Sequence, residues 1–273
     1  MKELSLAIFD LDGTIKIRDG IPHEIFAGIE HIQSQDITTT IMTGKGKDHL
    51  RRTLGANWDT LISQNSPVGL ENGGRITNTS GTENIRYHAL SPDEISAQIT
   101  LLESGELPFL LYVPENPNQK AKVWLKNERE AALFSDTDYL HYDIFTAPIT
   151  ELHTQIRQDN PCMFVFQPYS AGFRAEIPRD INIVSNEGVL HMNAQGINKG
   201  SGVLDLASIT GSTLNEIMIA GNDENDIPMF ELPVNRRVLV GEYEGIMSMP
   251  DLTKVADVNG LGSYLSLLDN PEI

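Results

Sequence analysis

The sequence predicts an α/β protein with a doubly wound parallel-sheet core, into which an α+β domain is inserted. Strand-like apolar segments alternate with amphipathic helical segments near both ends of the chain, as in doubly wound sheets. Between these regions the pattern changes to that of a mainly antiparallel sheet with two helices. We therefore expect residues 1–80 and 188–273 to form the core and residues 81–187 to form the inserted domain.

The first elements of the core follow from apolar runs and helix signals. Residues 4–9 form an apolar run that ends at Asp10, typical of a strand buried on both faces. Pro22 is suited to the first turn of a helix over residues 22–35, whose isoleucines lie on one face. The later segments predict a strand at 38–42, a helix at 47–54 and a short strand at 60–62.

The same signals predict the rest of the chain. In the inserted domain we expect helices at 92–103 and 150–158 and strands at 109–113, 122–125, 163–167 and 173–177. The alternation then resumes with a helix at 202–210, a strand at 216–220, a helix at 224–230 and a strand at 234–240.

Composition and charge limit the classes of function. The chain has 273 residues, with 20 Lys and Arg against 38 Asp and Glu, a formal net charge of −18. This balance argues against nucleic-acid binding and against anionic membrane surfaces. No apolar stretch approaches the roughly 20 residues of a membrane span. Cys162, the single cysteine, lies in an apolar run and is expected to be a buried thiol. We expect a cytoplasmic protein without a signal peptide.

The first strand ends in the sequence Asp10-Leu11-Asp12-Gly13-Thr14. Ligands of open α/β sheets bind beyond the carboxyl ends of the strands, so both carboxylates are expected at that crevice. Two carboxylates this close repel each other unless a cation lies between them, and Mg²⁺ is the natural partner. The alternative is an Asp-rich turn in which Gly13 supplies an unusual backbone angle.

Three further elements follow the same logic. Thr43-Gly44 ends the second strand, where a hydroxyl and free backbone N–H groups could hold a phosphate oxygen. Lys199 stands at the expected start of a helix, and residues 222–226 place several amides and carboxylates after a later strand. Taken alone, Thr43-Gly44 is also consistent with a turn, Lys199 with a solvated lysine, and residues 222–226 with a helix cap.

Taken in order, the four elements resemble those of the haloacid dehalogenase-like superfamily, and more narrowly its Cof-type sugar-phosphatase branch with a Rossmann-like core. The resemblance covers essentially the whole chain and includes the segment Glu71-Asn72-Gly73-Gly74. Only 33 residues separate Asp10 from Thr43, but 156 separate Thr43 from Lys199. The insertion therefore falls where this branch carries its cap domain.

The resemblance implies roles for the carboxylates and the lysine. Asp10 would be the nucleophile that forms an aspartyl-phosphate, and Asp12 the general acid and base. Lys199 would stabilise the transferring phosphoryl group, with Asp226 orienting Lys199 or a metal-bound water. The expected Mg²⁺ ligands are Asp10, the carbonyl of Asp12, Asn222 and Asp226. The groups expected around the phosphate are the Leu11 N–H, Thr43, Gly44, Lys199 and Asn225.

Two residues depart from the family pattern. The fourth motif usually begins Gly-Asp, whereas Gly221 is followed here by Asn222. Three outcomes are open: Asn222 ligates the metal weakly, Asp223 or Asp226 takes over, or activity is lost. Lys45 stands where the branch often carries Arg, which removes bidentate recognition of an anionic substrate group.

The sequence thus predicts a Mg²⁺-dependent phosphomonoester hydrolase for a small phosphorylated metabolite, with sugar phosphates as the expected substrate class. A phosphosugar mutase or phosphotransferase is the alternative within enzymes. A phosphometabolite-binding protein with a metal site weakened by Asn222 is the alternative outside them. The sequence gives no indication of the oligomeric state.

Overall fold

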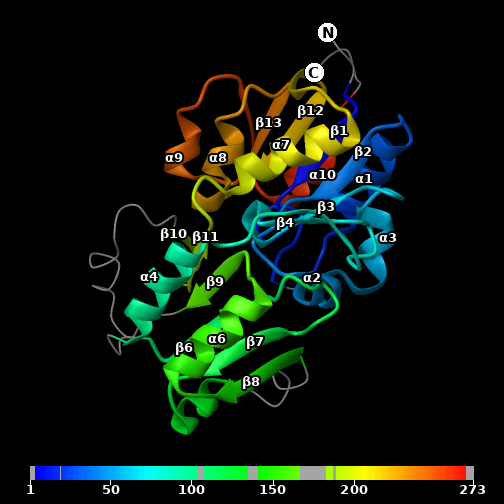
Figure 1. The fold of residues 1–273 in the computed structure, drawn as a ribbon. Helices are drawn as coiled ribbons and strands as arrows, with labels where there is room; N and C mark the ends of the chain where they lie inside the picture. The colour runs from blue at the N-terminus through cyan, green and yellow to red at the C-terminus, as the bar shows by residue number, and fades with distance from the viewer. Residues whose placement is uncertain are drawn as a thin grey trace. The chain divides into compact units, whose positions relative to one another are not determined.

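The computed structural model describes residues 4–18, 20–103, 107–134, 141–166, 183–186 and 189–268 (Figure 1). The chain divides into two compact units, each described separately below. The core unit comprises Met1–Lys45, His49–Arg86 and Asn198–Ile273. The insert unit comprises Gly46–Asp48 and Tyr87–Ile197. Its main boundaries therefore fall at 86/87 and 197/198, six and ten residues after the 80/81 and 187/188 expected from the sequence.

A five-stranded parallel sheet forms the centre of the core unit. Its strand order is β14-β13-β12-β1-β2, and each pair of neighbours runs parallel. The strands are β1 (Leu6–Phe9), β2 (Thr38–Ile41), β12 (Ile217–Gly221), β13 (Arg236–Val240) and β14 (Leu252–Val255). The first strand lies beside strands from both halves of the sequence. The predicted α/β fold with a parallel sheet is confirmed.

Helices cover both faces of this sheet because alternate residues of a strand point to opposite sides. Ala7 and Phe9 of β1 join the apolar cluster of α1 and α10, whereas Leu6 and Ile8 join that of α7, α8 and α9. The helices are α1 (His23–Gln33), α7 (Lys199–Thr210), α8 (Ile227–Phe230), α9 (Glu244–Met247) and α10 (Val258–Leu265). Both faces of the sheet are therefore buried, which explains the continuous apolar run of β1.

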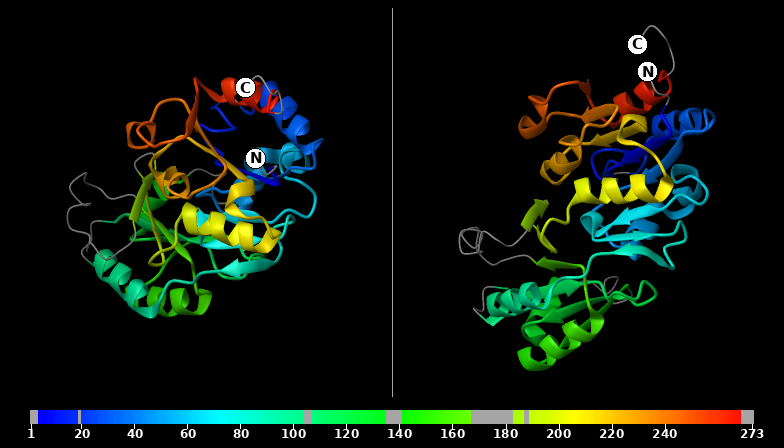
Figure 2. Two further views of the ribbon diagram at one scale, coloured as in Figure 1. Left: turned by 90° about the horizontal axis from the view of Figure 1, so that it is seen from above. Right: turned by 45° about the horizontal axis from the view of Figure 1, so that its top comes forward.

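Two glycines let α1 and α10 approach closely, and Figure 2 shows these helices side by side in blue and red. A Cβ on Gly28 would lie 2.7 Å from the carbonyl oxygen of Gly262. A Cβ on Gly262 would lie 2.4 Å from the carbonyl carbon of Glu24. Any larger residue at either position would push the helices apart.

The segment after β2 corrects one prediction from the sequence. Residues 60–62 were expected to form a strand, but α3 (Trp58–Leu61) is helical, with Trp58 and Leu61 buried in the core cluster. The next strand is β3 (Val68–Leu70), which extends beside the end of β2 through a parallel bridge between Met42 and Gly69. The remaining elements here are α2 (Lys47–Leu54), η1 (Gly55–Asn57), η2 (Glu71–Gly73), β4 (Arg75–Thr77) and β5 (Asn84–Tyr87).

The insert unit contains a six-stranded sheet in the order β10-β11-β9-β6-β7-β8. Its pairs are antiparallel except for β7 and β8, which run parallel. The strands are β6 (Phe109–Tyr112), β7 (Ala121–Leu125), β8 (Tyr142–Thr146), β9 (Met163–Phe166), β10 (Ile183–Asn186) and β11 (Val189–Asn193). The helices are α4 (Pro92–Glu103), η3 (Glu128–Leu133) and α6 (Ile149–Asp159). The strand expected at 173–177 lies outside the described residues.

The insert unit has its own apolar core and a buried polar network. Cys162 is buried, as expected. Asp159 accepts hydrogen bonds from the Tyr112 hydroxyl at 2.9 Å, from Lys122 Nζ at 2.7 Å and from Gln155 Nε2 at 3.0 Å. The buried carboxylate of Asp159, at the end of α6, thus binds donors from β6 and β7 and connects the helix to these two strands. In the described part of the chain, no helix is long and apolar enough to span a bilayer.

Gln98 of α4 leads to a prediction about stability. Its side chain is 0% exposed, and among the described residues neither its amide oxygen nor its nitrogen has a hydrogen-bond partner. Because an unpaired buried amide costs about 1–3 kcal/mol, Gln98→Leu should raise the free energy of unfolding of the insert unit by about 1 kcal/mol. Urea unfolding followed by circular dichroism measures the change.

The exposed Gln119→Leu is the matched control, since it makes the same replacement where water already satisfies the amide. Its free energy of unfolding should stay within about 0.5 kcal/mol of the unaltered protein. A destabilised Gln98→Leu protein would show that the amide has a partner after all.

Candidate active site

The site lies where the carboxyl ends of three neighbouring strands meet. Asp10 follows β1, Thr43 follows β2 and Asn222 follows β12, and these strands are adjacent in the order β12-β1-β2. Asp10 N donates to the carbonyl oxygen of Ala220 at 2.9 Å, so the hydrogen bonding between β1 and β12 continues to the carboxyl end of β1. Parallel pairing therefore brings together residues that are more than 200 positions apart.

A buried ion-pair cluster lies at the centre of the site. Lys199 Nζ lies 2.6 Å from Asp10 Oδ1 and 2.5 Å from Asp226 Oδ1. The three residues are 1%, 6% and 0% exposed, respectively. Lys199 is the first residue of α7, where Asn198 caps the helix through a hydrogen bond from Ser201 N. Lys199 thus stands at the start of the helix, as expected, and the first turn of the helix delivers the lysine to the carboxylates.

Burial and charge shift the pKa values of this cluster. Burial, reinforced by the nearby Asp226 carboxylate, outweighs the attraction of Lys199 and raises the pKa of Asp10 from 3.8 to about 6. Burial disfavours the charged form of Lys199, but the two carboxylates outweigh it and raise the pKa of Lys199 to about 12. The lysine is therefore a fixed cation beside the expected nucleophile.

Asp226 uses both of its carboxylate oxygens on protein donors. Oδ1 pairs with Lys199, and Oδ2 accepts hydrogen bonds from the backbone N–H groups of Asn222 at 2.8 Å and Asp223 at 3.1 Å. Of the roles considered from the sequence, this arrangement favours orientation of Lys199 over metal ligation. Asp223 accepts from Glu224 N at 2.7 Å and caps the short helix η6 (Glu224–Asp226).

The Asn222 side chain lies among the oxygens expected to hold a metal. Its hydrogen bonds are best satisfied when Nδ2 faces Asp10 Oδ2 at 3.3 Å, the Asp12 carbonyl oxygen at 2.9 Å and Thr14 Oγ1 at 2.9 Å. Gly13, with φ +78°, leaves room for the Asn222 side chain, because a Cβ there would lie 2.3 Å from one terminal atom of the amide. The amide therefore bridges the two oxygens expected to bind Mg²⁺.

The donor set fits Mg²⁺, but with little negative charge. In the described ranges, no group of three or more His, Cys, Asp or Glu residues could hold a metal ion. The oxygens that converge are Asp10 Oδ2, the Asp12 carbonyl and, after rotation of its amide, Asn222 Oδ1. These are hard oxygen ligands of the kind Mg²⁺ accepts alongside water and substrate phosphate. Asp10 is the one carboxylate among these ligands, because Asn222 stands where the family usually has Asp. We therefore expect Mg²⁺ to bind weakly in the absence of substrate.

Asp12 is held by two lysines. Lys45 Nζ pairs with its Oδ2, and Lys16 Nζ lies 3.2 Å from its Oδ1. Burial raises the pKa of Asp12, but hydrogen bonds and charge from Lys45 and Lys16 outweigh burial and lower it below the ordinary 3.8. The sequence placed Asp12 at the site and noted Lys45. It gave no signal for Lys16, which the turn after Gly13 brings back to Asp12.

The expected phosphate-binding groups surround the same edge. The Leu11 N–H donates to the Asp10 carboxylate. Thr43 is 2% exposed and accepts from Lys45 N at 3.2 Å, and Asn225 in η6 is 7% exposed. Gly44 lies against Asn72, whose Oδ1 would be 2.9 Å from a Cβ at that position.

Asn72 is a site residue whose role sequence reasoning missed. Its backbone N donates to Thr43 O at 3.0 Å, and its buried Oδ1 has no hydrogen-bond partner in the part of the chain that the structure describes. The signal was present in the sequence, since Asn72 belongs to the segment Glu71-Asn72-Gly73-Gly74. Its side chain supplies an acceptor beside the Thr43-Gly44 loop.

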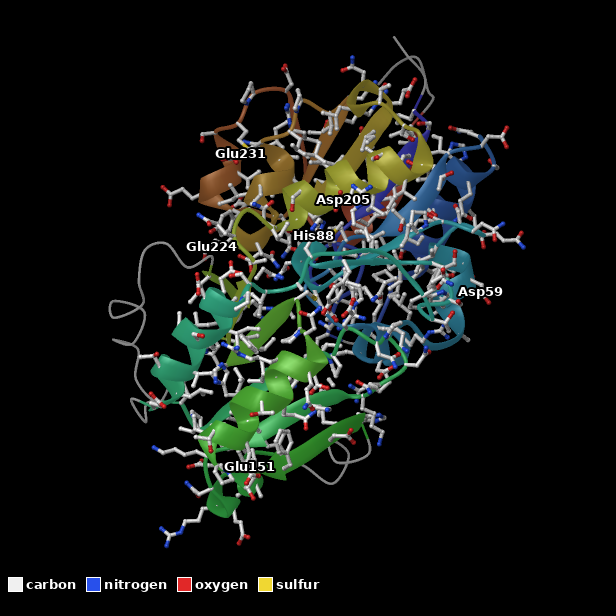
Figure 3. All side chains as sticks on the ribbon, in the orientation of Figure 1. Asp59, His88, Glu151, Asp205, Glu224 and Glu231 are labelled. Atoms are coloured by element: carbon white, nitrogen blue, oxygen red, sulfur yellow. The ribbon has the colours of Figure 1, made fainter. Side chains whose placement is uncertain are left out.

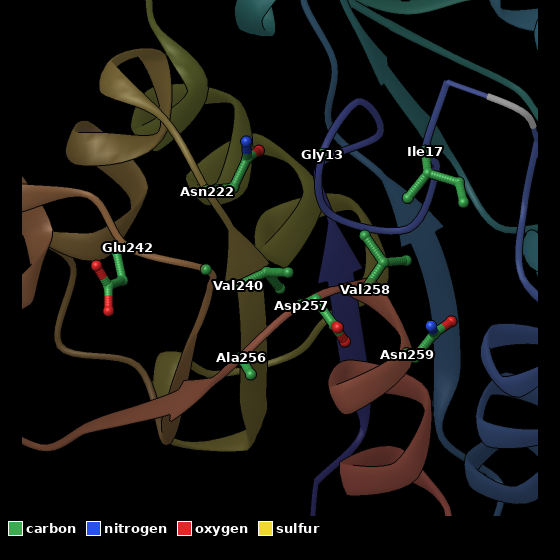
Figure 4. A pocket seen from close by; sticks show the side chains of 10 residues that line it. Gly13, Ile17, Asn222, Val240, Glu242, Ala256, Asp257, Val258 and Asn259 are labelled. Atoms are coloured by element: carbon green, nitrogen blue, oxygen red, sulfur yellow. The ribbon is translucent and has the colours of Figure 1, made fainter.

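A pocket of about 430 Å³ adjoins this edge of the sheet (Figure 4). Gly13 and Asn222 line it on the side of the Asp10 cluster. The loops after β13 and β14 complete it, including Val240, Glu242 and Asp257. Neither Asp10 nor Lys199 lines this pocket, so the hydrogen-bond geometry and not the cavity defines the site.

The sequence profile of the haloacid dehalogenase-like hydrolases matches residues 7–241, and the chain belongs to this family. The chain is therefore an enzyme of the hydrolase class, as the sequence predicted. It is 26% identical to an HMP-PP phosphatase of Citrobacter koseri over 98% of this chain and 97% of that protein. A phosphoglycolate phosphatase of Methanosarcina acetivorans is 41% identical, but only over 20% of this chain.

Solved structures of phosphatases share the fold. A sugar phosphatase of haloacid dehalogenase subclass IIB superimposes with a TM-score of 0.77 and 20% identity, covering 98% of this chain and 100% of that one. A phosphatase of the same superfamily from Bacteroides thetaiotaomicron gives 0.77 at 17% identity, covering 97% and 94%. The predicted membership of the haloacid dehalogenase-like superfamily is confirmed by the profile match, and these structures confirm the predicted fold.

The Asn222 geometry generates a prediction about metal affinity. Asn222→Asp places a second carboxylate beside Asp10 Oδ2 and the Asp12 carbonyl, so the affinity for Mg²⁺ should rise about tenfold or more. Without metal, the two carboxylates repel each other, so the variant should melt at a lower temperature in EDTA. Calorimetric titration with Mg²⁺ and thermal melting measure both effects.

Asn215→Asp is the control, because the exposed Asn215 lies at the opposite end of β12 and adds the same charge. Its affinity for Mg²⁺ should equal that of the unaltered protein. Equal affinity in Asn222→Asp would place the metal elsewhere.

The raised pKa of Asp10 predicts a pH-dependent stability. The folded-state pKa of about 6 lies above the unfolded value. The stability that Asp10 contributes is therefore fully present below about pH 4 and lost as the pH rises through 6. In EDTA, Asp10→Asn should thus raise the free energy of unfolding by about 1–3 kcal/mol at pH 8, and by less at pH 5. Urea unfolding at both pH values tests this, and an equal effect at both would contradict it.

Proposed function

We propose that the chain is a Mg²⁺-dependent phosphomonoester hydrolase that acts on a small phosphorylated metabolite, with sugar phosphates as the expected class. The observation that carries the proposal is the buried Asp10 with Lys199 at 2.6 Å on one oxygen. This leaves Asp10 Oδ2, on the side of Asn222 and Thr14, as the oxygen available for attack. The full-length similarity to an HMP-PP phosphatase supports the class of reaction.

Each step can be assigned to groups of the core unit. Asp10 Oδ2 attacks phosphorus in line and forms an aspartyl-phosphate. Lys199 Nζ, the Leu11 N–H and the Thr43 hydroxyl stabilise the negative charge that develops on the phosphoryl oxygens. Asp12 gives a proton to the leaving oxygen and then takes one from the water that hydrolyses the intermediate.

Mg²⁺ would contribute by neutralising charge. Phosphatases of this superfamily generally use Mg²⁺, which offsets the repulsion between the Asp10 carboxylate and the substrate phosphate when bound. The Asp10 carboxylate, the Asp12 carbonyl and the Asn222 amide oxygen would hold it. We further propose that the insert unit serves as the specificity domain that this branch carries at the same point of the sequence.

A second candidate is a phosphometabolite-binding protein without turnover. The Asn222 amide, which donates to both expected metal ligands, is the observation that favours it. Tight ligand binding that is independent of Mg²⁺, without phosphate release, would support this candidate. A mutase would convert a sugar monophosphate to an isomer instead of releasing phosphate.

Phosphate release from p-nitrophenyl phosphate, with Mg²⁺ and with EDTA, tests the proposal. Asp10→Asn should abolish release, a loss of at least about 10³-fold, because an amide cannot act as the nucleophilic carboxylate. Asp59→Asn removes the same charge from an exposed position near α3 (Figure 3) and should retain full activity. Substantial release by folded Asp10→Asn protein would remove the nucleophile assignment.

A further inference from the structure

A second buried ion pair lies in the core unit, between η2 and β4. Arg75 Nε donates to Glu71 Oε2 at 3.0 Å, and the side chains of Arg75 and Glu71 are 2% and 0% exposed. Arg75 is also bonded to β5, because its Nη1 donates to Asn84 Oδ1 at 3.2 Å. Well-packed apolar residues are often as stable as a buried ion pair. Stability alone therefore gives little reason for these charges, and their neighbours indicate another role.

Glu71 begins a turn with an unusual backbone. The φ angles of Glu71, Asn72 and Gly73 are +55°, +54° and +91°, so three consecutive residues have a positive φ. Glycine adopts such angles freely and asparagine tolerates them, but glutamate does not, because its Cβ approaches the backbone. A strained conformation of this kind persists only where surrounding contacts hold it. The buried bond from Arg75 to the Glu71 side chain is such a contact.

The turn is bonded to the loop that carries Thr43. Glu71 N donates to Lys45 O at 3.2 Å, and Asn72 N donates to Thr43 O at 3.0 Å. These two bonds reach the residues on either side of Gly44, and a Cβ on Gly44 would lie 2.9 Å from Asn72 Oδ1. If the turn relaxed to ordinary backbone angles, its N–H groups would point elsewhere and release the loop.

The same turn packs against the first turn of α7. A Cβ on Gly73 would lie 2.5 Å from Asn198 O and 3.0 Å from Gly202 N. These two atoms form the first hydrogen bond of the helix, at 3.0 Å, and Lys199 lies between them in the sequence. The place of the turn therefore sets the place from which Lys199 reaches Asp10.

We propose that Glu71 and Arg75 are positioning residues, whose ion pair holds this turn and thereby aligns the Thr43 hydroxyl and the Lys199 ammonium around the phosphoryl group. Both residues act through the backbone of the turn and not on the substrate itself. The inference rests on the proposed phosphatase function. Because the aligned groups act on charge that develops in the transition state, their displacement lowers kcat more than it raises KM.

A double variant tests the pair without leaving an unpaired buried charge. Glu71→Gln/Arg75→Met removes both charges and keeps side chains of similar size, so its melting temperature should stay within about 3 °C of that of the unaltered protein. With p-nitrophenyl phosphate and Mg²⁺, we expect kcat to fall about 10- to 100-fold and KM to change by less than about threefold. A folded double variant that keeps kcat within about threefold overturns the inference.

A glycine variant separates backbone strain from the other effects of the substitution. Glu71→Gly/Arg75→Met adopts the positive φ at position 71 without the ion pair, so its kcat should exceed that of Glu71→Gln/Arg75→Met by about fivefold or more. Equal kcat values in the two double variants would contradict a restraint on the turn.

The matched control removes another ion pair of the core unit. Arg86 Nη1 lies 2.6 Å from Asp205 Oδ1, between β5 and α7 and outside the turn. Arg86→Met/Asp205→Asn takes away one charge of each sign, as the test variant does. Its kcat should equal that of the unaltered protein.

Hydrogen exchange measured by NMR separates this inference from the proposed function. In the unaltered protein, the amides of Glu71 and Asn72 should exchange within about tenfold of the rate of the Gly241 amide, which donates to Val255 O at 2.9 Å. In Glu71→Gln/Arg75→Met, the amides at positions 71 and 72 should exchange about tenfold faster or more, with the Gly241 amide unchanged.

The outcomes are distinct. No phosphate release by the unaltered protein overturns the proposed function, and the exchange rates then decide on the positioning role. Faster exchange of the two amides than expected in the unaltered protein overturns that role, even where the double variant does not fold. Equal exchange in the unaltered protein and the double variant overturns it as well.

Discussion

The buried cluster of Lys199, Asp10 and Asp226 is the interaction on which the rest of the site depends. A buried charge without a partner costs several kcal/mol, so Lys199 can stay ionised only beside the carboxylates, and each carboxylate depends on the lysine. This requirement fixes the end of β1, the first turn of α7 and the loop after β12 relative to one another. It also leaves one negative charge in excess, which a cation or a phosphoryl-transfer reaction can use.

Asn222 changes the electrostatics of this arrangement more than its shape. The amide reaches the same oxygens that a carboxylate at this position would share with a metal. It can satisfy those oxygens itself as a donor, or turn its own oxygen toward a cation. The choice depends on what else enters the site, because a substrate phosphate supplies the negative charge that the amide lacks. Metal binding and substrate binding are therefore expected to be coupled in this protein.

The sequence predicted the features that depend on strand ends and chain order. The parallel core and the meeting of Asp10, Thr43 and Asn222 follow from apolar runs that stop at polar residues, and the family follows from the resemblance of the four motifs in their order. Details that depend on side-chain direction were not predictable. The pairing of Asp226 with Lys199 requires the geometry of η6, and Lys16 reaches Asp12 only through the turn after Gly13. Residues 60–62 read as a strand because Leu61 and Ile62 are apolar, but packing of Trp58 makes the segment helical.

The order of strands in the core sheet has a consequence for synthesis on the ribosome. The strand β1 lies between β2 and β12, but β12 emerges only after the whole insert unit has been made. The sheet of the insert unit comes from one continuous stretch and needs no later partner. The nascent chain can therefore complete the insert unit while β1 and β2 still expose apolar faces, which makes this the stage of biosynthesis most prone to aggregation.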